Sequence, residues 1–247
     1  MRNSMQRFHY KNQEYDGLVI FPFDPNAKDN TMQLNEFAEI IGEGLLTKEK
    51  WKPIPTESNR NKIVQNEDGT SIMEIPTLNG LKKLLAIAQP ISYLTVKRTC
   101  ELNFKSQGIF NEESYSGDYY LKEPGIIENL LYRVENSIVF GENRLPTIIT
   151  KAASLWYTIA RYQAFSNGNK RTALLATVDF LQNNFLIFNL GPKTDLEKQL
   201  YNVSLKIAND EYSEENVKLF IKDHVIVDFD MLNYLITYVP QFKIIDS

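Results

Sequence analysis

Two strongly apolar helical segments that flank one short polar loop constrain the fold of this chain most. Apolar residues recur three and four positions apart in 146–162 and again in 170–183. The first segment is apolar around nearly its whole circumference, which predicts a central buried helix. The loop between them, 163–169, is polar and contains Gly168. We expect the helical core to present this loop from the middle of a domain.

Helical periodicity dominates the chain from about residue 92 to residue 225. The predicted helices of this part are Leu94–Phe104, Gly125–Val134, Pro146–Tyr162, Lys170–Asn183, Asp195–Asn209 and Ser213–His224. The first ninety residues mix strand signals at 17–23 and 62–75 with helical spacing around Leu34–Ile41 and again at 81–88. The sequence therefore predicts a mainly α protein: a small α+β domain of unknown role over 1–90, a helical domain over 91–225 and a C-terminal helical extension over 226–247.

Composition narrows the classes of partner. With 43% hydrophobic and 23% charged residues, the 247-residue chain is ordinary globular protein, and its net charge of −4 argues against nucleic acid as a partner. No stretch approaches the roughly 20 apolar residues that cross a bilayer, so we expect no membrane association. Cys100 has no second cysteine to pair with, and the N-terminus lacks the apolar run of a signal peptide. A cytoplasmic location is the resulting expectation.

The loop residues indicate a site for phosphate groups. Backbone amides near the start of the helix after the loop carry partial positive charge, and Gly168 allows successive amides to converge on one oxygen. Lys170 and Arg171 add charge-assisted donors suited to a di- or triphosphate. The alternative is an ordinary turn between helices that is followed by two solvated cations.

The stretch GlnAlaPheSerAsnGlyAsnLysArgThr (163–172) resembles the signature of the Fic/Doc (Fido) family. It is similar to the death-on-curing form, His-x-Phe-x-Asp/Asn-Ala/Gly-Asn-Lys-Arg. Segments 94–102 and 122–134 resemble the family's first helix and its Asp-Pro-Gly-x-x-Glu segment, whereas residues 1–90 lie outside the resemblance. The resemblance implies a Fic/Doc-type helical bundle with a short β-hairpin flap, around Tyr115–Glu123, that holds an extended piece of a target protein.

The resemblance also implies roles for individual residues. Phe165 is expected to anchor the loop. Asn167, Gly168, Asn169 and Lys170 are expected to bind the phosphates of a nucleotide, together with Arg171. Mg²⁺ is expected to accompany the nucleotide, and Asn167 is a weak candidate ligand because it stands where many relatives have aspartate.

Death-on-curing toxins transfer the terminal phosphate of ATP to a hydroxyl of a bacterial translation elongation factor, so the resemblance implies a toxin with that activity and a host protein as target. Lys170 stands where the Fic adenylyltransferases have glycine, which favours phosphate transfer. Transfer of AMP remains the alternative. The self-inhibitory Ser/Thr-x-x-x-Glu-Gly/Asn helix of many Fic proteins has no full match in the sequence, so we expect a separate antitoxin, unless residues 1–90 regulate the site.

Gln163 occupies the position of the family's catalytic histidine. An amide cannot accept the proton of the acceptor hydroxyl, and loss of a general base typically costs about 10²–10⁴-fold in rate. His9 and His224 are distant in sequence and poor substitutes. Either the protein is a natural pseudoenzyme, or glutamine replaced histidine to silence a harmful enzyme; the otherwise intact motif favours the second. A catalytically silent module that binds a nucleotide or a partner is the competing interpretation.

Overall fold

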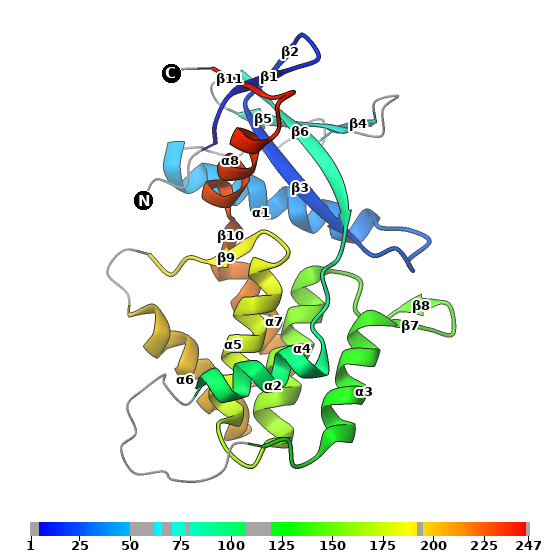
Figure 1. Ribbon diagram of the computed structural model, residues 1–247, viewed down its shortest axis with the longest axis vertical. Helices are drawn as coiled ribbons and strands as arrows, with labels where there is room; N and C mark the ends of the chain where they lie inside the picture. The colour runs from blue at the N-terminus through cyan, green and yellow to red at the C-terminus, as the bar shows by residue number, and fades with distance from the viewer. Residues whose placement is uncertain are drawn as a thin grey trace. The chain divides into compact units, whose positions relative to one another are not determined.

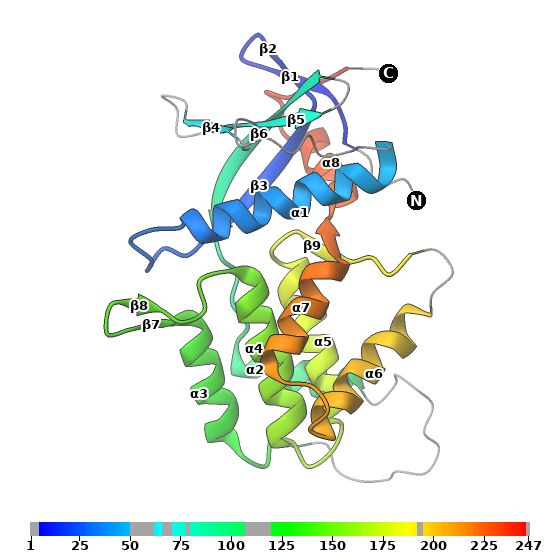
Figure 2. The same ribbon diagram turned by 180° about the vertical axis from the view of Figure 1, so that it is seen from behind.

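The computed structural model describes residues 5–49, 62–65, 71–77, 80–106, 120–191 and 195–245. Its contacts divide the chain into two compact units. The first, the N-terminal unit, comprises 1–25, 29–91 and 226–247, and the second, the helical unit, comprises 26–28 and 92–225. Figures 1 and 2 show the element order of both units. None of the described helices is long and apolar enough to cross a membrane.

A four-stranded sheet forms the centre of the N-terminal unit, in the order β3-β6-β5-β4. Its strands are β3 (Gly17–Phe23), β4 (Lys62–Gln65), β5 (Ser71–Thr77) and β6 (Gly80–Pro90). Strands β3 and β6 run parallel, with Gly17 opposite Leu84, and the other two pairs are antiparallel. Helices α1 (Thr31–Glu49) and α8 (Phe229–Tyr238) lie on opposite sides of β3, as the two views show. Both faces of β3 are therefore buried.

The prediction of a helix over 81–88 is wrong, because these residues form part of strand β6. Leu84, Leu85 and Ala86 are consecutive and all buried, and Leu85 belongs to a buried cluster with Tyr15 and Ile236. A strand buried on both faces is apolar without strict alternation, so its periodicity resembles that of a buried helix. The strands expected at 17–23 and within 62–75 are present.

The C-terminal segment is part of the N-terminal unit rather than a separate extension. Up to residue 245, where the described part of the segment ends, α8 is its one helix, and Ile236 of α8 joins a buried cluster with Phe8, Tyr15, Leu18 and Leu85. After α8, strand β11 (Lys243–Ile244) pairs with β1 (Phe8–Tyr10), which in turn pairs with β2 (Gln13–Tyr15). Apolar burial against β3 and backbone pairing with β1 together hold the end of the chain to its beginning.

The helical unit confirms the predicted mainly α domain. Its helices are α2 (Val96–Lys105), α3 (Pro124–Glu135), α4 (Ile148–Tyr162), α5 (Asn169–Gln182), α6 (Leu196–Ala208) and α7 (Glu214–His224). Short strands complete the list: β7 (Ile138–Val139), β8 (Glu142–Asn143), β9 (Leu186–Phe188) and β10 (Val225–Val227), where the chain returns to the N-terminal unit. Of the hairpin flap predicted around Tyr115–Glu123, residues 115–119 lie outside the described part of the chain.

Helix α4 is the central helix of this unit, as predicted. Eleven of its residues are buried, and Trp156 is the largest of them. The Trp156 indole Nε1 donates to Ser204 Oγ at 2.8 Å, and its ring makes edge contacts with Phe188 and Phe220. One side chain thus links α4 to α6, β9 and α7. The loop that follows α4 is consequently presented from the most buried element of the unit.

Candidate active site

The loop between α4 and α5 is held in one shape by its own side chains. Gln163 caps the C-terminus of α4 in the left-handed conformation, with φ 49°, and Gly168 precedes α5 with φ 75°. The side-chain amide of Asn169 makes two hydrogen bonds to the backbone of Phe165. Its Oδ1 accepts from Phe165 N–H at 2.8 Å, and its Nδ2 donates to the Phe165 carbonyl at 2.8 Å. The Phe165 side chain is buried. Asn169 therefore closes the loop on itself, over the buried Phe165 ring.

Asn103, at the end of α2, fixes the second half of the loop. Its buried side-chain Nδ2 donates to the Asn167 carbonyl at 2.9 Å and to Thr172 Oγ1 at 2.8 Å. Thr172 Oγ1 in turn donates to the Gly168 carbonyl at 2.9 Å. These bonds hold the start of α5 from behind, which leaves the pocket side of the loop available.

Backbone pairing joins the loop to the residues just before α3. Ser166 N–H donates to the Tyr120 carbonyl at 3.0 Å, and the amides of Lys122 and Glu123 both donate to the Ala164 carbonyl at 2.9 Å. Leu121 and Phe165 form an antiparallel bridge. The C-terminal end of the predicted flap therefore lies directly against the loop.

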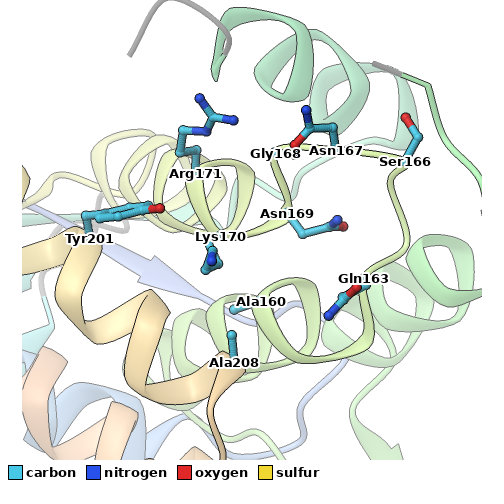
Figure 3. Close-up of a pocket in the computed structure, with 10 residues that line it drawn as sticks. All are labelled: Ala160, Gln163, Ser166, Asn167, Gly168, Asn169, Lys170, Arg171, Tyr201 and Ala208. Atoms are coloured by element: carbon cyan, nitrogen blue, oxygen red, sulfur yellow. Dashed lines mark hydrogen bonds between the residues drawn. The ribbon is translucent and has the colours of Figure 1, made fainter. Parts of the chain in front are cut away.

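A pocket of about 310 Å³ opens beside the loop. Residues from α4, the loop, α5 and α6 line it: Ala160, Gln163, Ser166, Asn167, Gly168, Asn169, Lys170, Arg171, Tyr201 and Ala208 (Figure 3). The structure thus brings together every residue that the sequence singled out for nucleotide or catalytic roles, while Phe165 lies beneath them in the core.

Two cationic side chains and unpaired backbone amides lie together at the start of α5. The N-cap residue Gly168 has no side chain to cap the helix, and the Asn169 and Lys170 amides have no hydrogen-bond partner in the described chain. By contrast, α2, α4, α6 and α7 each begin with a side-chain cap. Lys170 and Arg171 leave the first turn of α5 in different directions, and the Tyr201 ring points towards this turn from α6 (Figure 3). Orphan amides and two cations together favour an anion.

The pocket offers little to a metal ion by itself. No carboxylate is among its described lining residues, and the described part of the chain contains no cluster of three histidine, cysteine, aspartate or glutamate side chains that could hold a metal. The Asn167 amide oxygen accepts from Gly168 N–H at 2.7 Å, while its Nδ2 is buried without a partner. Mg²⁺ commonly keeps several waters and binds through substrate phosphates, so a metal entering with a nucleotide fits these residues better than a protein-held one.

Neither histidine replaces the missing base. His9 belongs to β1 of the N-terminal unit, and His224 ends α7, where its ring stacks on Phe220 and Nδ1 lies 2.8 Å from the Phe220 carbonyl. Neither lines the pocket. Burial raises the pKa of the Cys100 thiol, which keeps it protonated and poorly nucleophilic near neutral pH. The position of Gln163, exposed at the pocket edge, therefore has no substitute base among these groups.

The sequence did not predict that several residues belong to the site. Tyr201 and Ala208 reach the pocket because α6 packs beside α5, which a helical pattern alone does not reveal. Asn103 follows the segment that resembles the family's first helix, but only its burial identifies it. Asp179 of α5 accepts from Arg98 Nε of α2 at 3.1 Å and raises the pKa of that guanidinium, so the pair connects the two helices.

Replacing Asn103 with alanine should destabilise the helical unit. The change removes the donor that Thr172 Oγ1 and the Asn167 carbonyl share, and buried polar groups without partners cost about 1–3 kcal/mol. We expect the free energy of unfolding, measured by urea denaturation, to fall by that amount. Lys97→Ala, at an exposed position on the same helix, should change it by less than about 0.5 kcal/mol. Equal losses in the two variants would contradict this role of Asn103.

Comparison with known proteins supports the relationship that the motif suggested. Residues 93–181 match the sequence profile of the Fic/DOC family. A 71-residue stretch is 32% identical to Toxin Doc of Mycolicibacterium smegmatis (strain ATCC 700084 / mc(2)155), which covers 29% of this chain and 54% of that protein. The chain thus spans about half the length of this curated relative. The region that matches the family profile runs from before α2 to Leu181 in the last turn of α5, and therefore includes the entire loop.

Proposed function

We propose, from the match of residues 93–181 to the sequence profile of the Fic/DOC family, that the helical unit binds ATP at the start of α5 and is a Doc-like phosphotransferase weakened by Gln163. The acceptor is a side-chain hydroxyl of a host protein, such as a translation elongation factor. One observation carries the proposal: an uncapped helix start and two cations line a pocket that has no carboxylate among its described lining residues. Such a pocket suits a polyphosphate and disfavours a cation as its ligand.

Separate groups of the pocket bind the phosphates and take part in the transfer. The amides at the start of α5 and the side chains of Lys170 and Arg171 bind the phosphates and stabilise charge that develops during transfer. In the reaction, the acceptor oxygen forms a bond to the γ-phosphorus, the bond from that phosphorus to the bridging oxygen of ADP breaks, and the hydroxyl proton leaves. Mg²⁺ bound with the nucleotide supplies further charge neutralisation. Gln163 has no basic atom for the proton, so the proton passes slowly to water.

Two alternatives depend on separate residues. Transfer of AMP requires the α-phosphate to lie next to the acceptor; the charge and bulk of Lys170 favour the γ-phosphate there instead. A module that only binds a nucleotide is favoured by Gln163, which keeps the left-handed cap of α4 without offering a base. Both alternatives use the same pocket, and they differ in whether and from which phosphate a group is transferred.

The partners follow from the same site. A target segment that extends the pairing between Tyr120–Glu123 and Ala164–Ser166 would present its hydroxyl beside Gln163. The relative named Toxin Doc makes an antitoxin a natural second partner of this chain. An antitoxin that protects a host must cover the pocket or the flap, because these are the surfaces that a target needs.

ATP binding tests the proposal without requiring catalysis. The unaltered chain should bind ATP in the presence of Mg²⁺, as measured by isothermal titration calorimetry. Lys170→Ala should weaken binding by roughly ten- to hundredfold, since hydrogen bonds to charged groups are worth about 1.5–3 kcal/mol. Lys198→Ala, at an exposed position on α6, serves as the matched control and should bind normally. Absence of ATP binding by the unaltered chain would refute the proposed site.

A further inference from the structure

The hairpin β7–β8 carries an apolar tip that no described residue of its own unit covers. It joins α3 to α4 and projects from the helical unit (Figure 1). Its consecutive residues Ile138, Val139 and Phe140 are all exposed, and Phe140 is fully so, with a relative exposure of 101%. Three adjacent exposed apolar side chains on a protruding hairpin are typical of an interaction site.

Folding alone does not account for phenylalanine at the turn. Phe140 and Gly141 both have positive φ, 51° and 84°, as a two-residue hairpin turn of type I′ requires. Asparagine is favoured at the first of these positions, whereas a bulky residue with positive φ is strained. Phe140 therefore stabilises neither the turn nor a core, and its side chain is available for a partner.

The base of the hairpin is firmly held, so the tip is presented rigidly. Buried Ser137 donates to Asn143 Oδ1 at 2.7 Å and accepts from the fully buried Lys151 Nζ at 3.0 Å. Lys151 also donates to the Val134 carbonyl at 2.6 Å, in the last turn of α3. A fixed base reduces the conformational entropy that binding of the tip would otherwise cost.

The N-terminal unit contains a hollow with complementary properties. Its volume is about 600 Å³, and its apolar lining comes from β1, β6 and the residues after α8: Tyr10, Leu85, Ile87, Val239 and Phe242. Lys11 is its only charged residue among those described. The hollow is thus suited to an aromatic side chain that has a carboxylate nearby.

We propose that the hairpin tip of one molecule docks into this hollow of a second copy of the chain. Phe140 supplies the aromatic group, and Glu142, two residues on, supplies the carboxylate for Lys11. Glu142 pairs with Arg144 at 2.8 Å, but both side chains are more than 60% exposed, so this surface pair is easily exchanged. The two surfaces are therefore complementary both in their apolar groups and in their charges.

The two surfaces are different, so the contact is heterologous: each molecule offers one tip and one hollow. Association then continues into rings or open chains rather than ending at a symmetric dimer. A hairpin tip buries little area, which places the contact among weak, transient interfaces. We expect reversible association with a dissociation constant in the high micromolar range.

Sedimentation equilibrium of the full chain over a range of concentrations tests the proposal. The average mass of the unaltered chain should rise with concentration. Phe140→Asn should lower the association constant at least tenfold and leave the melting temperature unchanged or higher, because asparagine suits the turn. A strictly monomeric unaltered chain, or undiminished association of the Phe140→Asn variant, would overturn the proposal.

Exchanging the charges of Lys11 and Glu142 tests whether the hollow is the site at which the hairpin tip binds. Lys11→Glu and Glu142→Lys should each weaken association several-fold, and the double variant should restore it. All these positions are outside the proposed ATP site, so ATP binding should be unchanged in each variant. Failure of the double variant to recover would exclude the pairing of Lys11 with Glu142, and with it the docking of the tip in this hollow.

Discussion

Gln163→His is expected to raise the rate of phosphate transfer by about 10²–10⁴-fold, the typical contribution of a general base. The imidazole can accept the hydroxyl proton near neutral pH, which the amide cannot do. The backbone should tolerate the change, because position 163 is left-handed and histidine is among the residues enriched in that conformation. The remaining parts of the site, from Asn103 to Arg171, are already in place.

The measurement uses bacterial lysate, Mg²⁺ and ATP that carries label on either the α- or the γ-phosphate. Transfer from the γ position alone identifies a kinase of the Doc type, and transfer from the α position identifies an adenylyltransferase. Gln163→Asn is the matched control, since asparagine also accepts the left-handed conformation but has no basic atom. If the histidine variant binds ATP and transfers label from neither position, the chain is a binding module and the enzymatic proposal fails.

The loop could be predicted from sequence because its chemistry is local. Gly168, Lys170 and Arg171 lie within four positions of one another and directly begin a helix, so spacing alone brings them together. All three residues line the same pocket. The helices of 92–225 were predictable for a similar reason, since the apolar residues of each segment recur at helical spacing.

Residues that depend on packing between distant segments were not predictable. Asn103 and Thr172 meet because α2 lies against α5, and Tyr201 enters the site from α6. Strand β6 was misassigned because burial on both faces removes the alternation that distinguishes a strand. In each case the decisive information is which element lies next to which, and a single sequence does not contain it in local form.

Trp156→Ala is the substitution from which we expect the largest loss of stability, about 3–5 kcal/mol in the free energy of unfolding of the helical unit. The fully buried indole fills the space between α4, α6, α7 and β9, and helices do not close a cavity of this size without strain. Its removal also leaves Ser204 Oγ without its indole donor. Denaturation by urea, followed by far-ultraviolet circular dichroism, measures the loss, and a change below about 1 kcal/mol would contradict the role assigned to Trp156.

Two further variants separate the cavity from the hydrogen bond and connect both to the site. Ser204→Ala keeps the indole but leaves its N–H unpaired, so it should cost only about 1–3 kcal/mol. Leu219→Ala, at an exposed position on α7, should cost less than about 0.5 kcal/mol.

Because α6 carries Tyr201 and Ala208 into the pocket, loosening its contact with α4 should also weaken ATP binding by the folded Trp156→Ala protein. The buried centre of the unit thus determines the geometry of a site at its surface, and a variant that lost stability while keeping full ATP affinity would show that the loop is positioned by α2 and α5 alone.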